Sequence, residues 1–240
     1  MISHPSPNFN ERNAPISMIV LHYTAMPTCE AALKRLCMTE HPSGRVSAHY
    51  LVDVDGTSYQ LVDESKRAWH AGIGSWGDVR DVNSAAIGIE IQNLGLEEDG
   101  RRVPFPDAQI EAVIALCRDI QQRHGIHPWN IVGHSDVSPT RKQDPGEAFP
   151  WRRLAEAGVG LWTDGFASPK LPDEKMLASI GYDVSDFEKA LVAFKRHWHP
   201  EAIAERAGNT SGRIAAVLEM IAKGKDKKMD TKAKKQNRIV

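Results

Sequence analysis

The sequence lacks three features that would each place it in a broad class. No apolar run approaches the roughly 20 residues that a membrane-spanning helix needs. The first 15 residues have neither the basic end nor the apolar middle of a secretory signal. The formal net charge is -1 over 240 residues, so the molecule as a whole has no electrostatic basis for binding nucleic acid or an anionic membrane. We therefore expect a cytoplasmic protein, or a periplasmic one if a signal has been removed.

Cysteine is also scarce. The chain has three cysteines, an odd number, and none of them forms a CxxC pair. Cys29 and Cys37 lie eight residues apart in an expected helix, which separates their Cα atoms by about 12 Å. A disulfide requires about 7 Å or less, so this pair cannot form one. We expect all three to be reduced, mostly buried thiols on helical apolar faces, and none to be a nucleophile.

Hydrophobic residues make up 41% of the chain, enough for one sizeable core, and their spacing predicts strands. Residues 16–23 form a continuous apolar run, typical of a strand covered on both faces. Residues 87–92 alternate three isoleucines with Gly, Glu and Gln, which predicts a strand with two different faces. Residues 48–63 contain two strand-like runs around an Asp-Gly hairpin signal, and residues 130–132 form a last short strand.

Two long helical patterns lie between these strands. Thr28 can cap a helix over residues 29–39. Residues 107–124 carry apolar side chains at helical spacing, and Gly125 supplies the stop. Strands alternating with helices predict an α/β fold in which helices flank a mixed central β-sheet.

After Trp162 the pattern changes. A Pro- and Gly-containing linker is followed only by helical patterns, over residues 174–180, 185–200 and 211–222. From Lys223 onward seven Lys and one Arg stand against two Asp, which predicts disorder. We therefore divide the chain into a catalytic domain at 1–165, a small three-helix module at 166–222 and a basic tail at 223–240.

Two histidines lie at the ends of buried strands. His22 closes the first strand and His134 closes the last, and strand ends in α/β folds open onto ligand-binding crevices. Asp144 follows His134 on a loop long enough to fold back to the same point. Two imidazoles and a carboxylate are the ligand set of a catalytic zinc site that leaves a fourth position for water. In the alternative interpretation each histidine is a hydrogen-bonded core group and Asp144 is an exposed turn residue.

Glu90 and Lys142 are the candidates for the chemistry itself. Glu90 lies mid-strand on the face opposite three isoleucines, where a glutamate is disfavoured unless it is paired or functional. A carboxylate facing the catalytic water could accept its proton and return it to a leaving amine. Lys142 lies two residues before Asp144, on the same side if the loop is extended, where a cation could stabilise an oxyanion. A solvent-facing strand glutamate and an ordinary surface lysine are the alternatives.

His49 and His70 compete as metal ligands. His49 lies inside an expected strand and fits a hydrogen-bonded core histidine better. His70 lies in a Trp- and Gly-rich loop whose composition suits the wall of a carbohydrate or peptide groove. Trp69 and Trp76 in the same region are either stacking surfaces or packing residues.

Five motifs in this order resemble those of a known family. They are IVLHYTA, RVSAHYLVDVDG, AWHAG, IGIEIQN and VGHSDVSPTRKQDPG. The set is similar to the zinc-dependent N-acetylmuramoyl-L-alanine amidases of type 2, which share a fold with peptidoglycan recognition proteins. The resemblance covers residues 16–162. The helical module resembles the C-terminal part of a lipoprotein amidase of this family, where it is similar to a peptidoglycan-binding domain.

The resemblance implies a role for each candidate. It makes His22, His134 and Asp144 the Zn2+ ligands, Glu90 the catalytic acid and base, and Lys142 the stabiliser of the transition state. It also implies that three further residues line the substrate groove, namely Trp69, His70 and Asn83. The expected reaction is hydrolysis of the amide between N-acetylmuramic acid, including its 1,6-anhydro form, and L-alanine in peptidoglycan fragments during cell-wall recycling.

The chain departs from the family pattern in two places. Some relatives have a tyrosine where Ala48 stands, so Glu90 is expected to carry the proton transfers alone. The lipidated cysteine of the lipoprotein relative is absent near the start, which brings the expected location closer to that of the cytoplasmic recycling amidase. Two rival functions are a non-catalytic peptidoglycan receptor on the same fold and an interaction protein whose tail binds an acidic polymer.

Overall fold

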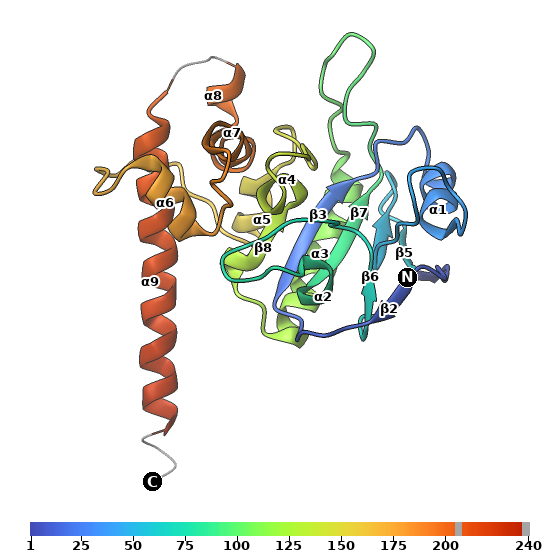
Figure 1. Ribbon diagram of the computed structural model, residues 1–240, viewed down its shortest axis with the longest axis horizontal. Helices are drawn as coiled ribbons and strands as arrows, with labels where there is room; N and C mark the ends of the chain where they lie inside the picture. The colour runs from blue at the N-terminus through green and yellow to red at the C-terminus, as the bar shows by residue number, and fades with distance from the viewer. Residues whose placement is uncertain (205–207, 237–240) are drawn as a thin grey trace.

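The computed structural model describes residues 1–204 and 208–236 and has a mixed α/β architecture (Figure 1). A six-stranded sheet has the order β1 (Ile2–Ser3), β5 (Ser58–Gln60), β4 (Tyr50–Val52), β7 (Ala86–Ile91), β3 (Met18–Tyr23) and β8 (Ile131–Gly133). Strands β4, β7, β3 and β8 are parallel neighbours, whereas β5 is antiparallel to β4. A separate antiparallel pair consists of β2 (Phe9–Glu11) and β6 (Lys66–Ala68). The predicted fold class is confirmed.

The hairpin between β4 and β5 turns where the Asp-Gly signal predicted it. Gly56 has a φ of +87°, and a Cβ atom there would lie 2.8 Å from the carbonyl oxygen of Ala108. A glycine is therefore required both by the turn and by its close approach to helix α3 (Asp107–His124).

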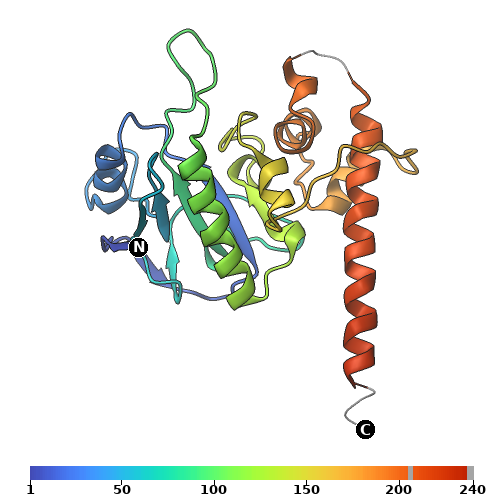
Figure 2. The ribbon, with the colours of Figure 1, turned by 180° about the vertical axis from the view of Figure 1, so that it is seen from behind.

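Helix α3 covers one face of the sheet (Figure 2). Its apolar side packs on the odd-numbered side chains of β3 and β7, including Ile19, Leu21, Ile87 and Ile89, all fully buried. The helix ends at Gly125, which has the left-handed conformation expected of a stop residue. The alternation read from the sequence thus assigns the isoleucines to the α3 side and Glu90 to the other.

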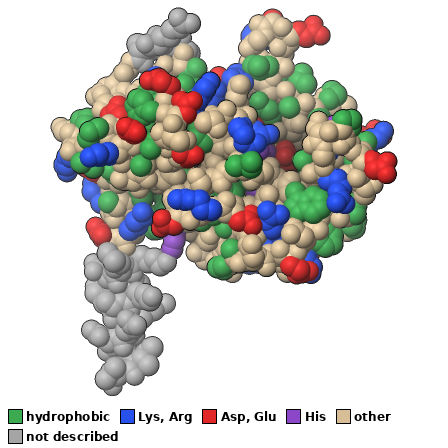
Figure 3. All heavy atoms as spheres, viewed as in Figure 1, with side chains coloured by type: hydrophobic (Ala, Val, Ile, Leu, Met, Phe, Trp, Pro, Cys, Tyr) green, Lys and Arg blue, Asp and Glu red, His purple; other side chains and the backbone are tan. Residues whose placement is uncertain are grey.

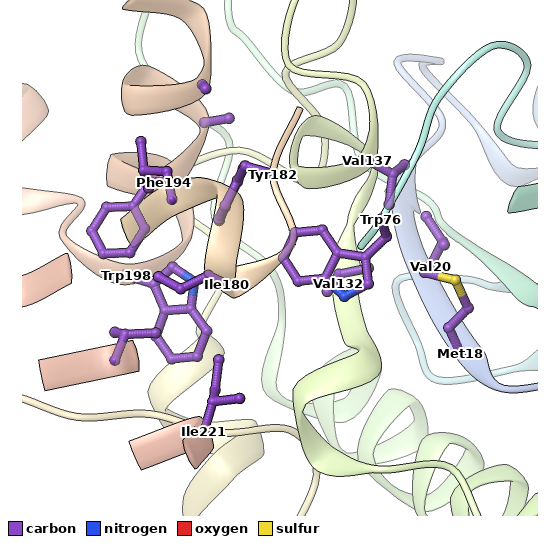
Figure 4. Packing of buried hydrophobic residues seen from close by; sticks show 14 of the residues in the cluster. Met18, Val20, Trp76, Val132, Val137, Ile180, Tyr182, Phe194, Trp198 and Ile221 are labelled. Atoms are coloured by element: carbon purple, nitrogen blue, oxygen red, sulfur yellow. The ribbon is translucent and has the colours of Figure 1, made fainter. Parts of the chain in front are cut away.

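The opposite face of the sheet is divided between two groups of helices. Helix α1 (Cys29–Cys37), capped by Thr28 as predicted, packs over Leu51 at one end. At the other end Met18, Val20 and Val132 join a large core with the C-terminal helices (Figure 4). Beside α1, the ends of β3 and β7 border a cavity.

The remaining helices are short except at the C-terminus. They are α2 (Val82–Ala85), the 3-10 turn η1 (Pro128–Asn130), α4 (His134–Val137), α5 (Trp151–Glu156), α6 (Asp173–Ile180), α7 (Phe187–Trp198), α8 (Glu201–Ala204) and α9 (Thr210–Gln236). No helix of the described ranges 1–204 and 208–236 is long and apolar enough to cross a membrane.

The part of the chain after residue 165 differs from the sequence prediction in two respects. Helix α9 continues to Gln236, so residues 223–236 are helical where disorder was predicted, and residues 237–240 lie outside the described part. The sequence expected three helices in the C-terminal module; the described structure adds α8.

Candidate active site

Three predicted ligands converge at the open middle of the sheet. His22 is the fifth residue of β3, His134 begins α4 directly after β8, and Asp144 lies on the following loop. The Nδ1 atoms of the two histidines are 2.9 Å apart, and Asp144 Oδ2 lies 3.1 Å from His22 Nδ1 and 2.9 Å from His134 Nδ1. All three side chains are buried. The convergence predicted from strand ends is therefore present.

The far side of each imidazole fixes which nitrogen faces the centre. His134 Nε2 lies 3.0 Å from the carbonyl oxygen of Ala71, which only accepts, so Nε2 carries the proton and Nδ1 presents a lone pair. His22 Nε2 lies 3.1 Å from His70 Nδ1, which leaves His22 Nδ1 facing the same point. A lone pair directed at a carboxylate oxygen is unfavourable without a cation between them. The donor set thus fits a metal of the Zn2+ type.

The charge states agree with this interpretation. Burial, reinforced by the neighbouring His134, lowers the pKa of His22 to about 4, so its imidazole is neutral at pH 7. Burial opposes ionisation of Asp144, but the two histidines beside it prevail and hold its pKa well below the usual range. The centre therefore places the neutral imidazole of His22 beside the ionised carboxylate of Asp144.

Glu90 lies beside His22 on the neighbouring strand. The two residues are register partners across β3 and β7, so their side chains leave the sheet on the same face. Glu90 Oε2 is buried and has no hydrogen-bond partner in the part of the chain that the structure describes. Burial and the charge of Asp144 raise the pKa of Glu90 well above its ordinary value, while Lys142 opposes the shift. An unpartnered carboxyl group beside the ligands is suited to exchanging protons with a bound substrate.

Glu90, His134 and Asp144 line a cavity of about 240 Å³, and residues of α1 form part of its wall. Figure 3 shows the corresponding face, with a hollow at whose base acidic and histidine side chains are visible. Trp69 lies in the wall, with the Arg45 guanidinium 5.1 Å from its ring centre. The lining residues that carry the chemistry or shape the walls are Tyr23, Met26, Arg35, Val46, Trp69, His70, Glu90, His134, Lys142 and Asp144.

His70 has a second place in the site that the sequence did not indicate. Its ring lies directly behind His22 and against Gly88, where a Cβ atom would come within 2.3 Å of the ring. Burial, with His22 next to it, keeps the pKa of His70 well below its ordinary value. His70 therefore orients a ligand from behind as well as bordering the cavity, and Gly88 makes room for it.

The other candidates from the sequence are buried in the scaffold. The Asn83 side chain is not in the cavity wall where the groove was predicted; its Oδ1 accepts the N–H groups of His70 and Ala71 at 3.0 and 2.8 Å. His49 accepts the Gly88 N–H at its Nδ1, consistent with the core interpretation. Trp76 is a core residue. Two cavity residues were missed: Met26 in the loop before α1 and Arg35 on α1. The sequence does not show which side of a loop or helix borders a cleft.

A His-His-Asp group beside an unpartnered carboxyl group is the arrangement that metal-dependent hydrolases use. The chain belongs to the Amidase_2 family, described as N-acetylmuramoyl-L-alanine amidase, whose sequence model matches residues 12–147. That range includes the three candidate ligands as well as Glu90 and Lys142.

Individual relatives extend the similarity beyond this range. The N-acetylmuramoyl-L-alanine amidase AmiD of Escherichia coli is 35% identical over 232 residues, covering 85% of this chain and 82% of AmiD. The 1,6-anhydro-N-acetylmuramyl-L-alanine amidase AmpD of Haemophilus influenzae is 36% identical over 165 residues, covering 62% of this chain and 86% of AmpD.

Two solved structures with fragments bound have the same fold. AmiD from Escherichia coli, in complex with its substrate anhydro-N-acetylmuramic acid-L-Ala-D-gamma-Glu-L-Lys, aligns with a TM-score of 0.71 at 33% identity over 86% of this chain and 89% of AmiD. AmpDh3 from Pseudomonas aeruginosa, in complex with anhydromuramic pentapeptide, gives 0.72 at 32% identity over 85% and 90%.

Proposed function

We propose that this protein is a zinc-dependent amidase that hydrolyses the bond between N-acetylmuramic acid and L-alanine in peptidoglycan fragments. The observation that carries the proposal is the convergence of His22, His134 and Asp144 beside Glu90. The bound fragments of AmiD and AmpDh3 support an anhydromuramyl peptide as substrate. Fragments of that kind, rather than intact wall, fit a role in cell-wall recycling.

The ligand residues would hold zinc through His22 Nδ1, His134 Nδ1 and Asp144 Oδ2. When bound there, zinc polarises the scissile carbonyl and lowers the pKa of water toward ~7. The protein's own part is to fix these three donors in a buried wall, with His70 and the Ala71 carbonyl holding the two rings from behind.

Glu90 would perform both proton transfers. Its carboxylate takes a proton from the attacking water as the water oxygen bonds to the carbonyl carbon. The same group then gives that proton to the alanine nitrogen as the carbon–nitrogen bond breaks, which releases a neutral amine. Burial favours the protonated form of Glu90, and this makes it an effective donor in the second step.

Lys142 would stabilise the charge that develops on the carbonyl oxygen. Its side chain borders the same cavity as Glu90, His134 and Asp144. A fixed ammonium in a site with little water offsets negative charge more strongly than solvent does. Trp69 and its neighbours in the wall would contact the sugar and peptide.

A non-catalytic receptor on this fold is the competing proposal. Such a receptor needs the groove but has no use for a complete ligand set with an unpartnered carboxyl group beside it. Both features are present here, and they favour an enzyme.

Mass spectrometry of reaction products tests the proposal. Anhydro and ordinary muramyl tripeptides are incubated with the protein, with and without a zinc chelator. We expect a free peptide that begins with L-alanine and a free sugar, whose masses sum to the substrate plus one water, and we expect chelation to stop their formation. Cleavage at another bond, or full activity of metal-free protein, would contradict the proposal.

A further inference from the structure

Asp136 is a fully buried carboxylate that the proposed reaction does not use. It lies in α4, two residues after His134. Its Oδ2 accepts the Gly133 N–H at 2.7 Å and lies 2.7 Å from His197 Nδ1, and its Oδ1 accepts the Tyr182 hydroxyl at 2.6 Å. The Asp136 oxygens are the acceptors of this cluster, and His197 Nδ1 donates to Oδ2.

The three donors come from two separate parts of the chain. Gly133 is the last residue of β8 and directly precedes His134. Tyr182 follows α6, and His197 lies in α7, more than 45 residues further along the sequence than Asp136. The Asp136 side chain therefore joins the C-terminal helices to the backbone from which a proposed metal ligand projects.

Aromatic packing holds both C-terminal donors in place. The His197 ring stacks on Trp151 with ring centres 3.8 Å apart and on Trp198 at 4.2 Å. Tyr182 packs edge-on against Trp76 at 5.1 Å, and Figure 4 shows it among the residues of this core. Burial and the adjacent carboxylate raise the pKa of Tyr182 well above its ordinary value, so its hydroxyl stays a donor.

The segment after β8 needs support of this kind. Helix α4 has four residues, too few to be stable through its own hydrogen bonds. The Ser135 N–H donates to the Asp144 carbonyl oxygen at 2.9 Å, so the backbones of two proposed ligands are already linked. Movement of the turn at residues 133–136 would shift His134 and Asp144 together.

We propose that Asp136, Tyr182 and His197 are positioning residues that hold His134 in its metal-binding orientation. The C-terminal helices then contribute to metal affinity without touching metal or substrate. This inference rests on the proposed zinc centre. Partners behind metal ligands typically contribute 10- to 100-fold to affinity, and for a contact made through the backbone we expect about tenfold.

Tyr182→Phe tests the inference with the smallest change, since it removes one hydroxyl. The dissociation constant for zinc is measured on the full-length, metal-free protein by competition with a chromophoric chelator, and we expect it to rise about tenfold. Tyr50→Phe is the matched control: Tyr50 is equally buried, donates to the Glu64 carboxylate at 2.7 Å and packs on the α3 side of the sheet. The control should bind zinc within about twofold of the wild type.

A second pair of variants separates the hydrogen bond from the packing. His197→Leu removes the donor and keeps much of the volume, whereas His197→Asn offers an amide N–H near the position of Nδ1. We expect zinc affinity to fall about tenfold in the leucine variant and to stay near wild type in the asparagine variant.

The outcomes are distinct. A wild-type protein that binds no zinc would contradict the proposed function itself. Zinc binding that is equal in the wild type, Tyr182→Phe and His197→Leu, together with lower unfolding temperatures of the metal-free variants, would overturn the positioning role and leave only a stabilising one. If His197→Leu does not fold, the comparison of Tyr182→Phe with Tyr50→Phe decides.

Discussion

Single residues in the site have more than one neighbour to satisfy. The Nδ1 atom of His22 faces Asp144, and its Nε2 atom faces His70. Rotation of the His22 ring would therefore break one of these two contacts. The neighbouring Glu90 is not held in this way, because its buried Oε2 atom has no hydrogen-bond partner within residues 1–204 and 208–236. The proposed ligands are thus fixed and the proposed acid is left available, which is the division of roles that hydrolysis requires.

Replacing Glu90 separates these two roles. We expect Glu90→Gln to lower kcat by about 10²- to 10⁴-fold, because the amide keeps the shape but cannot exchange the proton. The variant should retain one zinc per chain, measured by atomic emission on the purified protein. His134→Ala is the contrasting variant, expected to lose both zinc and activity. Zinc loss in Glu90→Gln would make the glutamate a structural group.

At the scale of elements, a polar cluster ties the end of α3 to the sheet. Glu64 accepts hydrogen bonds from Tyr50 on β4 at 2.7 Å and from Arg123 on α3 at 2.8 Å, and His124 Nε2 lies 2.6 Å from it. Burial opposes its ionisation, yet these bonds lower the pKa of Glu64 to about 2. The ionised form is therefore favoured by folding.

This shift predicts how stability depends on pH. A carboxyl group whose pKa is lower in the folded state contributes stability that is complete above its unfolded value near 4.5 and is lost as the pH falls toward 2. The shift corresponds to roughly 3 kcal/mol at most. We expect Glu64→Gln to unfold at lower denaturant at pH 7 and the gap from wild type to close as the pH falls from 4.5 to 2, measured by urea titration. A gap that stays constant over that range would contradict the assignment.

The sequence predicted those elements that have strong periodicity. The two-faced strand that places Glu90 and the helix that ends at Gly125 follow from side-chain alternation and stop signals, and both are present. Helix α4 and the β2–β6 pair were not predicted because segments of three or four residues are stabilised by distant partners. For the same reason the place of His70 behind His22 was not predicted, since it depends on the space above Gly88.

At the scale of the whole molecule, the predicted boundary at residue 165 does not divide the hydrophobic core. Met18, Val20 and Val132 from the sheet share one cluster with Leu177 and Phe194 from the C-terminal helices. The helices also supply both side-chain donors to Asp136. The C-terminal helices therefore brace the α/β part of the molecule.

Two truncations test this bracing. Deletion of residues 166–240 exposes several large apolar side chains. Burial of each contributes about 1.5 to 3 kcal/mol to the free energy of unfolding, and the sum rivals the total stability of a typical domain. We expect this fragment to aggregate or to melt at a much lower temperature in gel filtration and thermal unfolding. Deletion of residues 225–240 should leave melting and hydrolysis of a soluble muropeptide unchanged, because the core ends near Ile221 and Gly224 meets Trp129. A stable, monomeric 1–165 fragment would refute the bracing role.

The pairing of His22 with Glu90 across β3 and β7 limits how the gene can change. Side chains alternate along β7, so an insertion or deletion that shifted this strand by one residue would put an isoleucine opposite His22. The same shift would point the Glu90 carboxylate into the hydrophobic core beneath α3. Arg12, which donates to the Ala86 carbonyl at 3.0 Å, and Asp81, paired with Arg67, hold the start of the strand against such a slip. Length variation among descendants of this gene should therefore accumulate in outlying loops such as residues 94–104, and not in the segment that feeds β7.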